Sequence, residues 1–168
     1  MSLIEKIASY IPGYRGYKLK EVRRESDRLI RSTITNLLRS SKEDFENFGY
    51  NNLKELSKDQ QLRSLYDNVR FMYDKVWQKI DKAEAGYSGL FDLVKVREDK
   101  LDDVIKYDSQ LIEATQALRK ETTDLSSKSL KAEELKSAMD RILNLLRDLE
   151  SKIDARTNIL HELGEINA

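Results

Sequence analysis

The sequence predicts an all-α fold, an elongated antiparallel four-helix bundle with a short amphipathic helix at its N-terminus. Three observations predict it. Apolar residues recur at helical spacing over long stretches. Charged residues make up 36% of the chain and hydrophobic ones 39%, which suits narrow apolar stripes beside wide solvated faces. One proline and six glycines in 168 residues are too few for the turns of a multi-stranded sheet. We expect one domain, 1–168, in which 1–16 form the N-terminal helix and a turn.

The N-terminal stretch predicts a short helix over residues 2–11, with Leu3, Ile4, Ile7 and Ile11 on one face. Pro12-Gly13 ends it, and a turn rich in glycine and tyrosine follows, with Tyr14 and Tyr17. The favoured interpretation is a packing cap in which the tyrosines close one end of the bundle. The alternative is an element that docks on a membrane surface or on a partner.

A first long helix is expected to begin near Tyr17 and to stop at residues 49–52, where a glycine precedes two asparagines. Its expected inward side chains are Leu19, Val22, Leu29, Thr33 and Leu37, with Phe45 and Phe48 as further candidates. Ser41 with Asp44 could cap a new helix, so a break near Ser40-Ser41 stays open. Acid–base pairs at helical spacing, such as Asp27 with Arg31, predict an exposed face.

The second long helix is expected from about Leu53 to Ala85. Its seam repeats with alternating spacings of four and three, at Leu62, Tyr66, Val69, Tyr73, Val76, Ile80 and Ala83. Residues 86–95 then form an irregular connection with two glycines and with Tyr87, Leu90 and Phe91. Because this connection is apolar, we expect it to fold back onto the bundle end or to meet a partner.

The third helix, about residues 97–125, carries three polar residues on its apolar seam: Asp108, Thr115 and Thr122. If the second and third helices are antiparallel across Gly86, Asp108 lies level with Tyr73, and we expect the Tyr73 hydroxyl to donate to it. The seam changes phase after Leu125, which predicts a turn at residues 126–129.

The fourth helix has the longest seam, from Leu135 to Leu163. Its apolar members are Leu135, Met139, Ile142, Leu146, Leu149, Ile153, Leu160 and Leu163. Arg156 is the one polar position in this series, and we expect it to form an ion pair with Asp99 across the turn.

Charge and composition narrow the function classes. Thirty basic and thirty acidic residues cancel, but residues 1–40 hold nine basic and four acidic ones, a local excess of +5. Cysteine is absent, no apolar run approaches a membrane span, and Glu5 does not fit a signal peptide, so a cytoplasmic location is expected. No specific nucleic-acid partner is expected, because acids interrupt the basic run of Arg23, Arg24, Arg28 and Arg31.

No catalytic, metal-binding or cofactor motif is found in the sequence. The single histidine, His161, follows Asn158 by three residues, so the Glu-x-x-His pairs of di-iron bundles are absent, and we expect it to face solvent. Asp102 and Asp103 point from different helical faces and make no acid–base pair. We therefore expect no enzyme, no cofactor and no metal. An alternative is a ligand or catalytic site inside the bundle, which requires a polar cavity around Asp108, Thr115 and Tyr73.

Two segments resemble those of uncharacterised prokaryotic helical proteins. They are Ile11-Pro12-Gly13-Tyr14-Arg15-Gly16-Tyr17-Lys18 and Gly86-Tyr87-Ser88-Gly89-Leu90-Phe91-Asp92. That group has no established activity, so the resemblance implies no function. It implies only that the two glycine–tyrosine turns belong together at one end of the bundle.

The leading functional hypothesis is a non-enzymatic interaction or scaffold protein that uses the Gly/Tyr-rich turns at one bundle end. The candidate interaction residues are Tyr14, Tyr17, Tyr87, Leu90 and Phe91. The partner is an unidentified protein or a second copy of the chain, including exchange of a helical hairpin between two copies. The alternative is a peripheral membrane protein that binds through the N-terminal amphipathic helix and the adjacent basic segment.

Overall fold

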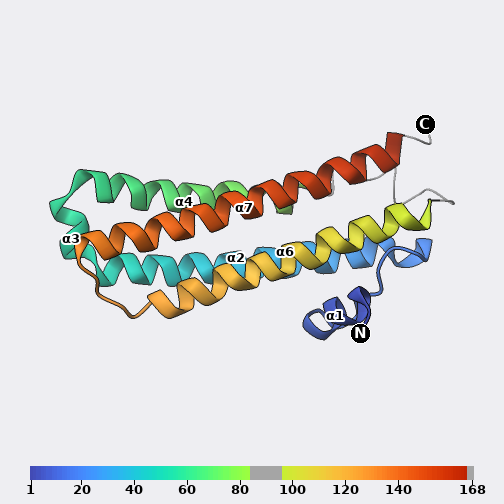
Figure 1. Ribbon diagram of the computed structural model, residues 1–168, viewed down its shortest axis with the longest axis horizontal. Coiled ribbons are helices and arrows are strands. Elements are labelled where there is room, and N and C mark those ends of the chain that lie inside the picture. Colours follow the sequence, from blue (N-terminus) through green and yellow to red (C-terminus); the bar gives the residue numbers. More distant parts are fainter. Residues whose placement is uncertain (84–95, 166–168) are drawn as a thin grey trace.

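The computed structural model describes residues 1–83 and 96–165, and in these ranges its regular structure is entirely helical (Figure 1). The all-α prediction is therefore confirmed. The elements in chain order are α1 (Leu3–Tyr10), the 3-10 turn η1 (Lys20–Val22), α2 (Arg23–Asn51), α3 (Leu53–Lys58), α4 (Gln60–Asp81), α6 (Glu98–Leu125) and α7 (Ala132–Glu165).

The N-terminal helix forms where the sequence predicts it, because a capping box fixes its start. The Ser2 side chain accepts a hydrogen bond from the backbone N–H of Glu5 at 3.2 Å, and the Glu5 carboxylate accepts one from the N–H of Ser2 at 2.6 Å. Ile7 is buried and α1 packs against α6. Gly13 and Gly16 follow with positive φ, a conformation that suits glycine and lets the chain reverse direction.

The first long helix differs from its prediction in its start and in part of its inward stripe. It begins at Arg23 rather than near Tyr17, and Leu19 is 54% exposed rather than inward. The helix is continuous at Ser40-Ser41, where a break was left open. Val22, Phe45 and Phe48 are buried as expected, and the other core residues form a neighbouring stripe, namely Ile30, Ile34 and Leu38. Because two adjacent apolar stripes run along this helix, spacing alone did not decide which one faces inward.

The expected second helix is divided into α3 and α4 at Asp59. The Asp59 carboxylate accepts hydrogen bonds from the backbone N–H groups of Gln61 and Leu62, at 2.8 and 3.4 Å. An aspartate in this position starts a new helix, since it satisfies N–H groups that have no partner within the helix. The short α3 consequently forms a corner between α2 and α4.

The four long helices form an elongated bundle, but not a wholly antiparallel one (Figure 1). Each long helix runs opposite to the one before it in the chain, and α6 and α7 are joined through residues 126–131, so the predicted turn there is confirmed. However, α2 packs against α6 as well as against α4, and α7 packs against α4 as well as against α6. The neighbours α2 and α6 run in the same direction, as do α4 and α7.

The helix α4 is shorter than its neighbours, so the composition of the core changes where it ends. α4 ends at Asp81, whose backbone carbonyl accepts a hydrogen bond from Nη1 of Arg31 in α2 at 3.1 Å. Such carbonyls at helix ends need partners from outside the helix. Beyond this level α2, α6 and α7 continue without α4, and the turn that follows α1 contributes Tyr14 and Tyr17 to the core.

Candidate functional site

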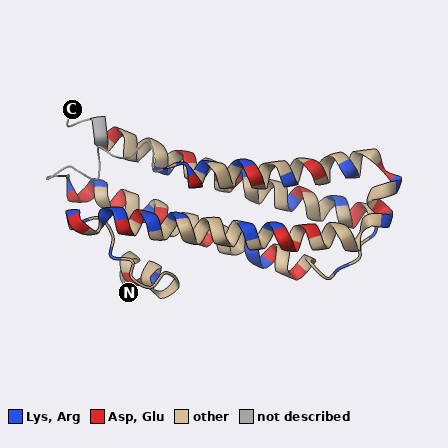
Figure 2. Ribbon diagram, turned by 180° about the vertical axis from the view of Figure 1, so that it is seen from behind, with Lys and Arg blue, Asp and Glu red and all other residues tan. Residues whose placement is uncertain are grey.

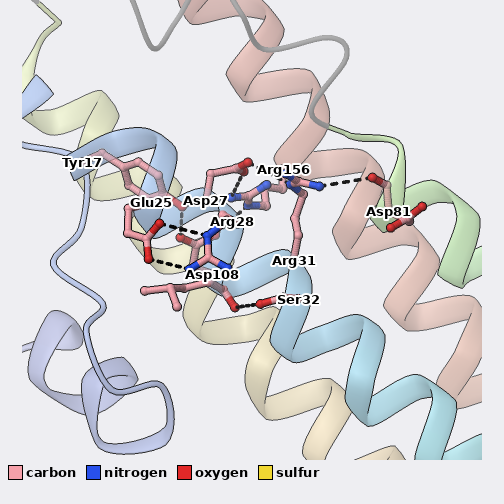
Figure 3. A network of polar contacts seen from close by, with 10 residues as sticks. Tyr17, Glu25, Asp27, Arg28, Arg31, Ser32, Asp81, Asp108 and Arg156 are labelled. Atoms are coloured by element: carbon pink, nitrogen blue, oxygen red, sulfur yellow. Dashed lines mark hydrogen bonds and ion pairs between the residues drawn. The ribbon is translucent and has the colours of Figure 1, made fainter. Parts of the chain in front are cut away.

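The centre of the molecule's polar interior is an ion pair between α7 and α6. Nε of Arg156 donates to Oδ1 of Asp108 at 2.6 Å, and their side chains are 1% and 0% exposed. Figure 3 shows the two side chains among the surrounding polar groups. A fully buried ion pair is stable only if further hydrogen bonds satisfy the remaining polar atoms.

A second acid and a second base complete the charge balance. Nη2 of Arg156 donates to Oδ1 of Asp27 at 2.9 Å, and Nε of Arg31 donates to the other Asp27 oxygen at 2.8 Å (Figure 3). Asp27 and Arg31 are one helical turn apart on α2, with side chains 2% and 10% exposed. Two carboxylates and two guanidinium groups therefore neutralise each other within the interior, which offsets part of the cost of burying them.

Tyr14 and Tyr17 attach the N-terminal turn to this cluster. Their hydroxyls donate to Oδ2 of Asp108 at 2.9 and 2.5 Å, and the Tyr17 hydroxyl accepts from Nη2 of Arg156 at 2.9 Å. The two rings meet edge to face with their centroids 6.2 Å apart. We call these six residues, Tyr14, Tyr17, Asp27, Arg31, Asp108 and Arg156, the charged layer.

Burial determines where the protons lie in the charged layer. Loss of solvent raises the pKa of Tyr14 and Tyr17 far above the ordinary value of a phenol, and the Asp108 charge raises both further. Burial also raises the pKa of Asp108, while Arg156 and the tyrosine hydroxyls oppose that rise. Both tyrosines consequently stay protonated and act as hydrogen-bond donors.

The burial of Tyr14 and Tyr17 corrects their expected role. The side chains are 2% and 0% exposed, so neither can contact a partner in this conformation. Their position fits the packing interpretation of the N-terminal turn instead. The other candidate interaction residues, Tyr87, Leu90 and Phe91, lie outside the described residues.

The partners expected for Asp108 and Arg156 were also wrong. Asp99 pairs with Arg97, through Nη2 at 2.7 Å, and not with Arg156. Tyr73 shares hydrogen bonds with Ser41, at 2.7 Å, and lies level with Thr122 rather than with Asp108. The expected contact of Asp108 with Tyr73 assumed that the second helix ends at the level where the third begins. In the structure α6 extends well past the end of α4 (Figure 1).

Ser41, Tyr73 and Thr122 form a second buried polar group, which we call the hydroxyl layer. The Ser41 hydroxyl is 2.7 Å from that of Tyr73 and 2.8 Å from that of Thr122, and all three side chains are buried. In α2 and in α6 the two layers are separated by the same number of residues, which agrees with the parallel direction of these helices. Thr115, the remaining polar seam residue, donates to the Leu111 carbonyl at 2.6 Å and does not share a site with Asp108 and Tyr73.

Part of the basic N-terminal segment belongs to the interior. Arg23 is 2% exposed and its Nε donates to the backbone carbonyl of Tyr17 at 2.8 Å, and Arg31 is buried as well. The exposed face expected for Asp27 with Arg31 is therefore wrong. One signal was available: continuing the stripe of Ile34 and Ile30 backward in steps of three and four leads to Asp27 and Arg23.

The described residues show neither a metal site nor a helix that could cross a membrane. Among the residues that the structure describes, no three His, Asp or Glu side chains are placed to hold a metal ion, and His161 is exposed as expected. Within the same residues, no helix combines the length and the apolar character that crossing a bilayer requires. Acidic and basic residues are interspersed along the long helices (Figure 2).

Two strongly exposed apolar side chains line a cleft at the opposite end of the bundle, where α2 turns into α3. Tyr50 is 78% exposed and Leu53 is 57% exposed. The cleft has a volume of about 440 Å³, and its apolar lining also includes Leu56 and Tyr66. We call this feature the corner cleft. Its rim carries both acidic and basic residues, Glu46, Asp67, Arg63 and Arg70.

The walls of the corner cleft are held firmly. The Tyr66 ring stacks on Phe45 with centroids 5.0 Å apart, and a Cβ atom on Gly49 would overlap this tyrosine ring. Asn52 donates to the carbonyls of Phe48 and Lys128, at 2.7 and 2.8 Å, and thereby ties the corner to the α6–α7 connection. The cleft is therefore a preformed hollow.

Comparison with known proteins adds no relative: no family model, no curated protein and no solved structure matches the chain.

Proposed function

We propose that this protein is a non-enzymatic interaction protein that binds an apolar segment of a partner protein in the corner cleft. The observation that carries the proposal is the exposure of Tyr50 and Leu53, 78% and 57%, beside a preformed hollow of about 440 Å³. An exposed tyrosine next to an apolar pocket is typical of a protein-binding surface, because aromatic side chains bury a large area at low entropic cost. The mixed charges at the rim favour a polar border around an apolar centre.

Photo-crosslinking tests this proposal with a matched control. A phenylalanine analogue that crosslinks on illumination replaces Tyr50 in one protein and Phe71 in another, since Phe71 is an apolar side chain on α4 that is 64% exposed outside the cleft. We expect a discrete adduct from position 50, none from position 71, and loss of the adduct when Leu53→Asp is added. Equal adducts from both positions, or an adduct that survives Leu53→Asp, contradict the proposal. An adduct of two copies would identify self-association.

A second candidate function is peripheral binding to an anionic membrane, and one observation favours it. Among the described residues, four of the seven exposed large hydrophobic side chains lie in the first 19 residues, namely Met1, Leu3, Tyr10 and Leu19. Arg15, Lys18 and Lys20 are exposed in the same stretch. Apolar and basic side chains together are the combination that binds anionic lipid surfaces. Cosedimentation with vesicles tests this function, and binding that does not depend on anionic lipid contradicts it.

A further inference from the structure

The apolar face of α1 is covered by the chain itself. Ile7 and Ile11 are 1% and 3% exposed, and α1 lies along α6. These are the residues that an interfacial helix would insert into a membrane. In this conformation the part of the apolar face formed by Ile7 and Ile11 is closed to the outside, while Leu3 at its start is 39% exposed.

The surface that α6 offers to residues 1–18 has the chemistry of an anionic lipid interface. It is apolar at Ile105, which lies close to Gly16 and Ile4, and acidic on both sides of that contact. Lys6 forms an ion pair with Glu113, and Lys18 forms one with Glu98 at 2.7 Å. An anionic bilayer offers the same two features, an apolar layer and negative groups that attract lysine.

Several contacts between residues 1–18 and α6 are weak enough to exchange. The side chains of Lys6 and Glu113 are 38% and 51% exposed, and those of Lys18 and Glu98 are 75% and 70% exposed, so solvent screens both ion pairs. A cleft of about 300 Å³ lies between Ser2, Leu3 and Ile4 on one side and Asp102, Ile105 and Lys106 on the other. The first turn of α1 is thus incompletely packed.

The charged layer keeps its net charge when Tyr14 and Tyr17 leave, although Oδ2 of Asp108 loses two hydrogen-bond donors. Arg156 still pairs with Asp108 and with Asp27, and Arg31 still pairs with Asp27. The departing side chains are neutral, so no unpaired charge remains in the bundle. The two tyrosine hydroxyls on Asp108 therefore help to hold the segment, together with the burial of Ile7 and Ile11.

We propose that residues 1–18 form a latch: the segment covers its own membrane-binding face by docking on α6, and an anionic lipid surface competes with α6 for it. This inference rests on the second candidate function above. In the open state the apolar face of α1 exchanges α6 for lipid, and Lys6 and Lys18 exchange Glu113 and Glu98 for lipid phosphates.

Locking the segment is the first test. Because the chain has no cysteine, Lys6→Cys with Glu113→Cys creates a unique pair that a short bifunctional maleimide can bridge. The probe is a set of vesicles of phosphatidylcholine with or without phosphatidylserine. We expect the unbridged protein to bind the phosphatidylserine vesicles and the bridged protein to lose at least about tenfold in affinity.

Loosening the segment is the complementary test. Tyr14→Phe with Tyr17→Phe removes both hydroxyls from Asp108, and we expect at least about tenfold tighter binding to phosphatidylserine vesicles. Tyr73→Phe is the matched control, since it also removes a buried hydroxyl but in the hydroxyl layer, away from the segment. The control should bind vesicles like the unmodified protein.

The outcomes separate the two ideas. If bridged and unbridged proteins bind phosphatidylserine vesicles equally, the latch is wrong while membrane binding stands. If no variant binds them, including the loosened one, both the latch and the membrane function are wrong. If Tyr73→Phe gains as much vesicle affinity as Tyr14→Phe with Tyr17→Phe, general destabilisation exposes apolar surface. This outcome also overturns the latch.

Discussion

The two buried polar layers of this bundle join the same two helices, α2 and α6, but by different chemistry. The charged layer contains two acids, two bases and two tyrosines, and the N-terminal segment takes part in it. The hydroxyl layer contains only the neutral groups of Ser41, Tyr73 and Thr122. A neutral hydroxyl can lose a partner at modest cost, whereas a buried charge cannot. We therefore expect the charged layer to fix the register of the helices and the hydroxyl layer only to fill the interior between them.

The largest effect is expected from removing the central base of the charged layer. Arg156→Met leaves Asp108 and Asp27 with one remaining base, Arg31, so one buried negative charge is uncompensated. We expect the free energy of unfolding to fall by about 3–5 kcal/mol. Urea denaturation followed by circular dichroism measures it.

A double variant keeps this prediction testable if Arg156→Met alone does not fold. Asp108→Asn with Arg156→Met removes one charge of each sign, keeps an oxygen acceptor for the tyrosines, and leaves Asp27 paired with Arg31. The double variant should recover more than half of the loss. If the loss of stability in the double variant equals the sum of the losses in the two single variants, the two residues are not coupled in the folded protein.

Alkaline pH should weaken the charged layer about twice as much as the hydroxyl layer. Burial raises the pKa of Tyr14, Tyr17 and Tyr73, so each contributes stability below the unfolded-state pKa of about 10 and loses it as pH rises further. Well above that pKa the loss is about 1.4 kcal/mol per pH unit for each tyrosine.

Tyrosine-to-phenylalanine variants separate this effect from the titration of other groups. Unfolding free energies are compared at about pH 9 and about pH 11, on either side of the unfolded-state pKa. Because only about one pH unit of this interval lies above the unfolded-state pKa, the total decrease should be smaller by about 2.8 kcal/mol in Tyr14→Phe with Tyr17→Phe, and by about 1.4 kcal/mol in Tyr73→Phe. Identical pH dependence in all three proteins would mean that these phenols are ionised in the folded state.

The smallest effect is expected in the hydroxyl layer at neutral pH. Ser41→Ala removes the hydroxyl that lies between Tyr73 and Thr122, and Thr122 retains the Leu118 carbonyl as an acceptor at 3.2 Å. We expect a loss of about 1 kcal/mol in the free energy of unfolding. A loss as large as that of Arg156→Met would remove the distinction between the layers.

From the sequence, some members of these layers could be recognised, but not their pairings between helices. Asp108 and Arg156 stand out because each interrupts a regular apolar seam, and both are buried. Their partners could not be deduced, because a seam gives the face of a helix but not which helices are neighbours. The parallel contact of α2 with α6 brings Asp27 close to Asp108, and Arg156 on α7 bonds to both. No local pattern in the sequence encodes the contact between α2 and α6.

Two other features show where local signals mislead. Asp27 and Arg31 have the spacing of an exposed ion pair, and only their alignment with Ile30 and Ile34 places them inside. Tyr50 and Leu53 lie in a stretch that predicts only a helix end, and their role in the corner cleft depends on α3, whose separation from α4 follows from the Asp59 cap.

Hydrogen exchange of the α1 amides tests the central claim most directly, namely that the hydroxyls of Tyr14 and Tyr17 tie the N-terminal segment to the charged layer. The protein is compared with Tyr14→Phe plus Tyr17→Phe, and the amides of α4 serve as the internal reference. We predict that exchange in α1, Leu3–Tyr10, becomes at least about tenfold faster while α4 changes much less. Unchanged exchange in α1, or an equal acceleration in both helices, would contradict this claim.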